Sequence, residues 1–128
     1  MPSMHTLKKY YWVVGVVVLL GLLIGTKMWT NTQPSALDSF AQCVTDAKAT
    51  FYGAFWCPHC QAQKKLFGRS ERLLPYVECS TPDSKGQTQV CIDKKITGYP
   101  LWEYADGTRA SGQQTLAQLA EKTGCTLP

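Results

Sequence analysis

The stretch 51–60 (FYGAFWCPHC) most strongly constrains how this chain can fold, because an apolar run leads directly into two cysteines three positions apart. Residues 50–56 carry no charge and are β-branched, aromatic or small, which predicts a central strand covered on both faces. Pro58 suits the first position of a helix, so Cys57 is predicted at a helix N-terminus, where free N–H groups and the helix dipole favour an anion. A thiolate is such an anion. Cys57 is therefore the candidate nucleophile, and Cys60 lies on the same helical face within reach of a disulfide.

A second constraint is the apolar segment near the N-terminus. Residues 10–24 are uncharged, and extending the segment to Trp29 gives it the ~20 residues that cross a bilayer. A cleaved signal peptide is the alternative, but residues 25–29 lack the small-x-small pattern of a cleavage site, so we expect an uncleaved anchor. Lys8 and Lys9 precede the segment and only Lys27 lies near its other end, which predicts a cytoplasmic N-terminus and an extracytoplasmic remainder.

The predicted organisation has four parts. They are a cytoplasmic N-terminus (1–9), a transmembrane anchor (10–29), a tether (30–36) and one folded domain (37–128).

Charge and cysteine content narrow the functional classes. The net charge is +4, but lysines flanking the anchor account for most of it, and paired basic residues occur later only at 64–65 and 94–95. This distribution argues against nucleic-acid binding. Six cysteines in an oxidising compartment suggest disulfide bonds.

The pattern of the remaining chain predicts a mixed α/β domain. Apolar residues at three- and four-residue steps predict a helix over 37–47, with Ser35 as its N-cap, and Lys64 and Lys65 are expected on the solvated side of the helix that follows Pro58. A small mixed sheet with helices on both faces follows from the order of elements. The expected strands are 50–56, 76–79, 101–104 and 108–110, and the expected helices after the first are 58–67, 88–96 and 115–123.

Several of these segments together resemble the thioredoxin superfamily. They are 51–61 with its CxxC, 65–68, 75–79, and Gly98-Tyr99-Pro100 before a strand. The resemblance covers about 40–124 and is nearest to the thioredoxin-like domain that is fused to, or partnered with, bacterial homologues of vitamin K epoxide reductase. One departure concerns the buried Asp that thioredoxin carries six residues before its first Cys. Phe51 stands at that position, and Glu78 is the candidate substitute for its role in proton handling.

The resemblance implies roles for further site residues. Pro58-His59 is the dipeptide of strongly oxidising Dsb-type proteins, and a partly protonated His59 would stabilise the reduced form and so tune the redox potential. Pro100 is implied to be a cis-proline facing the CxxC, with the Tyr99 backbone pairing with substrate. Trp56 is expected to add apolar substrate-binding surface, with ordinary core packing as the alternative.

The other four cysteines are interpreted as structural. Four cysteines allow three pairings, and we favour Cys79 with Cys91, closing a short loop, and Cys43 with Cys125, closing most of the domain. An electron relay from Cys79 and Cys91 to the active pair is a functional alternative.

The resemblance implies a thiol–disulfide oxidoreductase without a cofactor or metal, and the N-terminal segment predicts that it is membrane-anchored and extracytoplasmic. We expect it to oxidise cysteine-containing secreted proteins and to be reoxidised by a quinone-linked membrane partner of the vitamin K epoxide reductase type. The alternatives are an extracytoplasmic reductase or isomerase, a zinc module using Cys57, Cys60, Cys79 and Cys91, and a disulfide-stapled binding domain on a membrane stalk.

Overall fold

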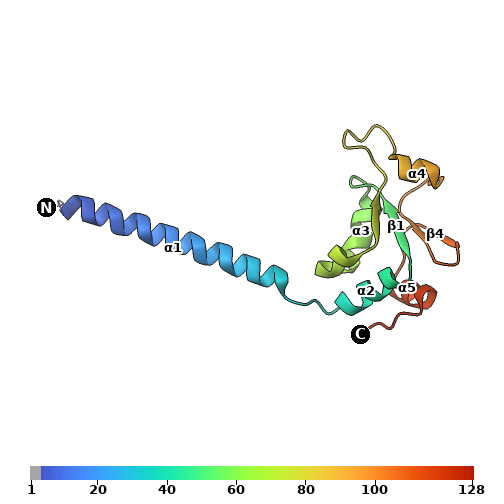
Figure 1. Ribbon diagram of the computed structural model, residues 1–128, viewed down its shortest axis with the longest axis horizontal. Helices are drawn as coiled ribbons and strands as arrows, with labels where there is room; N and C mark the ends of the chain where they lie inside the picture. The colour runs from blue at the N-terminus through green and yellow to red at the C-terminus, as the bar shows by residue number, and fades with distance from the viewer. Residues whose placement is uncertain (1–3) are drawn as a thin grey trace. The chain divides into compact units, whose positions relative to one another are not determined.

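The computed structural model describes residues 4–128 (Figure 1), which divide into two compact units. The first unit ends at Pro34 and the second is Ser35–Pro128.

Helix α1 (Met4–Thr32) makes up nearly all of the described first unit. Its stretch Leu7–Trp29 is 23 residues long and apolar enough to cross a membrane. Of the predicted N-terminal segment 1–9, residues 1–3 lie outside the described residues, and the rest are helical. The helix also continues into the predicted tether, because Pro34 is the first residue after it that opposes helical backbone.

The second unit is built on a sheet of four strands in the order β2-β1-β3-β4. The central strand β1 pairs parallel with β2 and antiparallel with β3, and β3 pairs antiparallel with β4. The strands are β1 (Thr50–Gly53), β2 (Tyr76–Glu78), β3 (Leu101–Glu103) and β4 (Arg109–Ser111).

Helices cover both faces of this sheet, which confirms the predicted mixed α/β architecture. They are α2 (Asp38–Asp46), α3 (Pro58–Leu66), the 3-10 helix η1 (Gly68–Leu73), α4 (Gln89–Asp93) and α5 (Leu116–Thr123). Neighbouring residues of a strand point to opposite faces. Phe51 and Trp102 therefore pack in the larger core with residues of α2, α3 and α5, whereas Tyr52 and Leu101 pack on the other face with Cys91 of α4.

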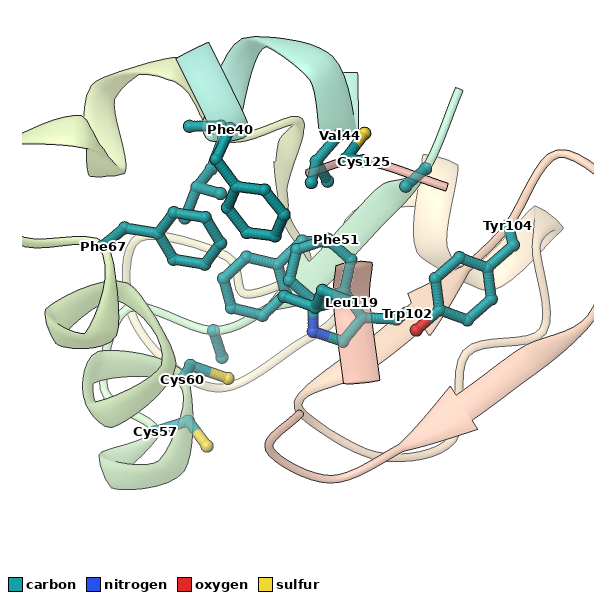
Figure 2. Packing of buried hydrophobic residues seen from close by; sticks show 14 residues of the cluster. Phe40, Val44, Phe51, Cys57, Cys60, Phe67, Trp102, Tyr104, Leu119 and Cys125 are labelled. Carbon is teal, nitrogen blue, oxygen red and sulfur yellow. The ribbon is translucent and has the colours of Figure 1, made fainter. Parts of the chain in front are cut away.

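Stacked aromatic rings fill the larger core (Figure 2). The rings of Phe51 and Trp102 lie 4.9 Å apart and nearly parallel, and Phe40 of α2 stacks on Phe67 at 5.9 Å. All four side chains are fully buried. This close packing holds β1 and α3 in a fixed position relative to each other, so the turn between them that carries Cys57 is held at both ends.

Two disulfides close the second unit. Cys43 of α2 is joined to Cys125 just after α5, and Cys79 just after β2 is joined to Cys91 of α4.

Some predicted boundaries are wrong. The strand predicted over 50–56 ends at Gly53, because the chain must turn at 54–57 to begin α3, and Phe55 and Trp56 are about half exposed. The N-cap of α2 is Leu37 rather than Ser35, and η1 occupies a stretch for which no element is predicted. Helix α4 is shorter than 88–96, since Lys95 adopts the left-handed conformation at φ 55°.

Candidate functional site

Cys57 occupies the N-cap position of α3. Its backbone is extended (φ −77°, ψ 120°), and Pro58 follows at the start of the helix, where no donor N–H is needed. The Cys57 N–H donates to the Ala54 carbonyl at 3.0 Å, which closes the turn between β1 and α3. The Cys57 side chain therefore lies at the positive end of the helix dipole, and its relative exposure is only 6%.

A cis peptide bond between Tyr99 and Pro100 lies opposite this cysteine. The Cys57 Sγ is 3.9 Å from the Tyr99 carbonyl oxygen, although the two residues are 42 positions apart in the chain. Pro100 is fully buried, and β3 begins at the next residue. The start of α3 and the start of β3 thus meet at the Cys57 sulfur.

Cys60 lies one helical turn deeper and is 1% exposed. Both cysteines are free thiols, and Figure 2 shows their sulfurs pointing from α3 toward the same side. Burial raises the pKa of the Cys60 thiol to about 12, and the neighbouring Cys57 sulfur adds to that rise. The Ala54 backbone and the Lys64 ammonium act in the opposite direction. Cys60 therefore needs help to lose its proton near neutral pH.

Gly53 at the end of β1 makes room for Cys60. A Cβ at this position would lie 3.0 Å from the Cys60 Sγ and 2.8 Å from Cε2 of the Tyr76 ring. The Cys60 sulfur and the Tyr76 ring carbon therefore lie on either side of the position that a side chain of residue 53 would occupy. The sequence carries no signal for this requirement, because it depends on the contact of α3 with two strands.

Glu78 at the end of β2 is hydrogen-bonded on both carboxylate oxygens. Oε2 accepts from the Tyr76 hydroxyl at 2.7 Å, and Oε1 accepts from the Ser80 N–H at 2.8 Å and the Phe55 N–H at 3.3 Å. The parallel pairing of β1 and β2 places Glu78 beside Gly53 and Tyr76 beside Phe51. The carboxylate thus joins β2 to the turn that precedes Cys57.

Trp56 is held at the edge of the site. Its indole Nε1 donates to Ser80 Oγ at 2.8 Å, and its ring meets the Tyr99 ring edge-on at a centroid distance of 6.1 Å. The side chain is 48% exposed, so it is not an ordinary core residue. Together with exposed Phe55 it presents apolar surface beside Cys57.

The two polar residues predicted on α3 differ in their surroundings. His59 is exposed one residue before Cys60, and its predicted influence on the redox potential remains a prediction. Lys64 was expected on the solvated side with Lys65, but only Lys65 is exposed. The Lys64 Nζ lies 3.5 Å from the centroid of the Tyr76 ring, because a helical residue four positions after Cys60 returns to the same face.

Gln63 of α3 is not among the predicted site residues, although its side chain is fully buried. Its amide accepts from Gln114 N at 2.7 Å, donates to Gln114 O at 3.0 Å, and accepts from the Trp102 indole at 3.3 Å. It links α3 to the segment before α5. Glutamine is common on helix surfaces, so the residue type alone gives no indication that Gln63 is buried and joins two elements.

The geometry defines a class of site. A dithiol pair begins a helix after a central strand, with the first sulfur at a cis-proline loop and the second buried behind it. Such a pair can alternate between two thiols and one disulfide.

Comparisons with known proteins agree with that class. No family model matches the chain. The chain is 40% identical over 106 residues to a protein of Arabidopsis thaliana named thiol-disulfide oxidoreductase LTO1. The matching region is 80% of this chain but 28% of that protein, so the chain spans less than a third of its relative.

Proposed function

We propose that the protein is a membrane-anchored, extracytoplasmic thiol–disulfide oxidoreductase with a thioredoxin-like domain, and that it introduces disulfides into secreted proteins. The arrangement of Cys57, at a helix start against the Tyr99 carbonyl, with Cys60 buried behind it, carries this proposal. The similarity to a protein named as a thiol-disulfide oxidoreductase supports it.

The reaction is two thiol–disulfide exchanges. A substrate thiolate attacks Cys57 Sγ of the oxidised pair, which forms a mixed disulfide and releases Cys60 as a thiolate. A second substrate thiolate then attacks the substrate sulfur of that mixed disulfide, and Cys57 leaves. The substrate gains a disulfide, and the Cys57–Cys60 pair gains two electrons. A quinone-linked membrane oxidase of the vitamin K epoxide reductase type would take those electrons and two protons, returning the pair to its disulfide form.

The extracytoplasmic location is supported by the apolar helix and by the two other disulfides. Disulfides persist in oxidising compartments and are rare in the cytosol. We place the anchor at 10–29, the cytoplasmic N-terminus at 1–9, and the catalytic domain outside, following the balance of Lys8 and Lys9 against Lys27.

The test of catalysis is oxidation of a reduced two-cysteine peptide by the full-length protein in detergent. With its Cys57–Cys60 pair oxidised beforehand, the wild-type protein should form the peptide disulfide, and Cys57→Ser should abolish this activity. Cys60→Ser cannot form the Cys57–Cys60 disulfide, so it should not oxidise the reduced peptide either. Mixed instead with the peptide in its disulfide form, it should accumulate a mixed disulfide on Cys57, visible as a mass increase equal to the oxidised peptide. Full activity of Cys57→Ser would reject the proposal.

The direction of electron flow is tested separately by the reduction potential of the pair. Pro58-His59 favours an oxidase, because a cation near the thiolate stabilises the reduced form. A value near ≈ −120 mV agrees with an oxidase, whereas a value near ≈ −270 mV, as in thioredoxin, would favour the reductase alternative. His59→Ala should lower the potential if the imidazole acts in this way.

The zinc module draws no support from the cysteine arrangement. Cys79 and Cys91 are bonded to each other, so the four thiolates required by that alternative do not exist together. A disulfide-stapled binding domain would have a Cys57–Cys60 pair that stays oxidised at the potentials where such catalysts work, and the same redox titration decides this point.

A further inference from the structure

Cys60 poses a chemical problem that the CxxC alone does not solve. A captured substrate without a second thiol cannot complete its own disulfide, and only attack by the Cys60 thiolate then expels it from Cys57. Yet the Cys60 side chain is buried and its pKa is raised to about 12. The position six residues before Cys57 is Phe51, whose side chain is packed between the rings of Trp102 and Tyr76 and has no titratable group.

Three residues supply titratable groups around this thiol. Tyr76 lies across Gly53 from the Cys60 sulfur, Glu78 accepts the Tyr76 hydroxyl at 2.7 Å, and the Lys64 ammonium lies over the Tyr76 ring. Cys57 and Lys64 are the described side chains whose charge acts on the pKa of Cys60. The three groups around the thiol come from two elements, since Lys64 is on α3 and Tyr76 and Glu78 are on β2.

We propose that Tyr76, oriented by Glu78, forms a proton path from Cys60, and that Lys64 stabilises the resulting thiolate. This inference rests on the proposed redox function of the pair. Tyr76 and Glu78 are positioning and proton-transfer residues, whereas the bond changes occur at the two cysteines.

The step balances in protons and electrons. No direct hydrogen bond joins the Cys60 thiol to the Tyr76 hydroxyl in the described part of the chain, so the Cys60 proton passes to the Tyr76 oxygen through one bridging water while the Tyr76 hydroxyl proton passes to the Glu78 carboxylate. The Cys60 thiolate attacks Cys57 Sγ of the mixed disulfide, the Cys57–Cys60 bond forms, and the bond to the substrate sulfur breaks. The substrate leaves with the electron pair as a thiolate, and the mixed disulfide is the oxidant.

The surroundings of Glu78 suit a fixed proton acceptor. Its second oxygen is held by the backbone N–H groups of Ser80 and Phe55, so the carboxylate stays in place when the Tyr76 hydroxyl turns. Burial and the adjacent Glu78 carboxylate raise the pKa of the Tyr76 phenol, which keeps it neutral and able to relay a proton.

The test separates attack by Cys57 from attack by Cys60. Full-length protein with Cys57 and Cys60 reduced and the other disulfides intact is mixed with an aryl disulfide that releases a coloured thiolate. The first burst of colour reports Cys57 attack, and the second reports expulsion of the other aryl thiolate by Cys60. Cys60→Ser should show the first burst only.

Two variants remove the proton path while preserving shape. Tyr76→Phe keeps the ring under Lys64, and Glu78→Gln keeps an oxygen for the two N–H groups. Each should slow the second burst at neutral pH by about tenfold or more, in line with the contribution of general acid–base catalysis, and leave the first burst unchanged. Their second-burst rates should rise in proportion to hydroxide concentration, so the deficit shrinks at high pH. Glu121→Gln, an exposed acid on α5, is the matched control.

Lys64→Met and Lys65→Met form a second matched pair, because only Lys64 reaches the Tyr76 ring. Lys64→Met should move the pH dependence of the second burst to higher pH, and Lys65→Met should not. An unchanged second burst in both Tyr76→Phe and Glu78→Gln would overturn this inference alone. Equal slowing of both bursts with a lowered unfolding midpoint would also overturn it, by assigning a purely structural role. Absence of the first burst in the wild-type protein would overturn the proposed function itself.

Discussion

At the scale of single residues, the two cysteines differ in what surrounds them and therefore in what each can do. Cys57 meets the Tyr99 carbonyl at the edge of the domain, whereas Cys60 lies over Gly53 and beside Tyr76 in the core. Cys57 is 6% exposed and Cys60 is 1% exposed, so the proposed reaction assigns contact with the substrate sulfur to Cys57. Cys60 acts within the protein, which suits release of a captured substrate.

Gly53→Ala should be destabilising, because its new Cβ would lie 2.8 Å from a buried ring carbon and 3.0 Å from the Cys60 sulfur. Overpacking of this kind costs typically ~1–3 kcal/mol of unfolding free energy. Chemical denaturation checks this value. Gly98→Ala is the control, since a Cβ there meets no atom within 4 Å. Equal effects of the two substitutions would contradict the steric argument.

The same residues show what the sequence can and cannot predict about the site. Cys57 and Cys60 are visible in sequence because an apolar run, a proline and two cysteines are adjacent. The contacts of Gly53, Tyr76 and Lys64 are not, because they depend on the register of β1 with β2 and on the position of α3 over both. Spacing along the chain carries no information about that register.

At the scale of elements, hydrophobic periodicity identifies the long segments and fails at the short ones. The mixed order of strands and helices is correctly predicted, since each has its own apolar pattern. The exposed turn at Phe55 and Trp56 is missed, because their apolar character continues the pattern of β1. Helix η1 is missed because Gly68 marks the end of α3 but gives no sign of a second helix directly after it.

The buried amide of Gln63 joins α3 to the segment before α5. In Gln63→Leu, Gln114 would lose hydrogen bonds at both its N–H and its C=O, and the Trp102 indole would lose its partner. A buried polar group left unsatisfied costs ~1–3 kcal/mol, so we expect a loss of at least about 2 kcal/mol in unfolding free energy. Gln113→Leu, at an exposed position, should change stability little in the same measurement.

Asp38 joins α2 to η1. Its carboxylate accepts from both terminal nitrogens of Arg72, from Ser70 Oγ and from Ser35 N. The hydrogen bond from Arg72, then those from Ser70 and Ser35, hold the pKa of Asp38 well below its usual value of 3.8. A carboxyl whose pKa is lowered by folding contributes stability above its unfolded pKa and loses it as pH falls through the folded pKa.

Asp38→Asn should therefore lower the thermal unfolding midpoint at pH 7, and its difference from the wild-type midpoint should narrow as pH falls below about 4. Asp46→Asn on the same helix is the control, because that carboxylate accepts from the exposed Gln42 side chain. A difference that stays constant down to low pH would show that the carboxylate charge is not responsible.

At the scale of the whole molecule, the two structural disulfides have separate effects on stability and on the site. Cys43–Cys125 spans 82 residues and encloses most of Ser35–Pro128, whereas Cys79–Cys91 spans 12. Loop entropy in the unfolded chain assigns about 4.5 kcal/mol to the longer loop and about 3 kcal/mol to the shorter one. Cys79, however, directly follows Glu78. Thr88 at the N-cap of α4 donates its hydroxyl to the Glu78 carbonyl and its N–H to the Cys79 carbonyl, so the shorter disulfide lies next to the site.

Replacing Cys43 and Cys125 by Ala should thus lower the free energy of unfolding more than replacing Cys79 and Cys91. The order should reverse for catalysis. Without the Cys79–Cys91 bond, α4 no longer holds the segment that follows Glu78. That segment contains Ser80, which accepts a hydrogen bond from the Trp56 indole and donates one to Glu78. At a temperature where both variants are folded, Cys79→Ala/Cys91→Ala should therefore slow peptide oxidation more than Cys43→Ala/Cys125→Ala does. Urea denaturation and the peptide assay on the same preparations check the two orders. If the variant that loses more stability also loses more activity, the disulfides act only by stabilising the domain.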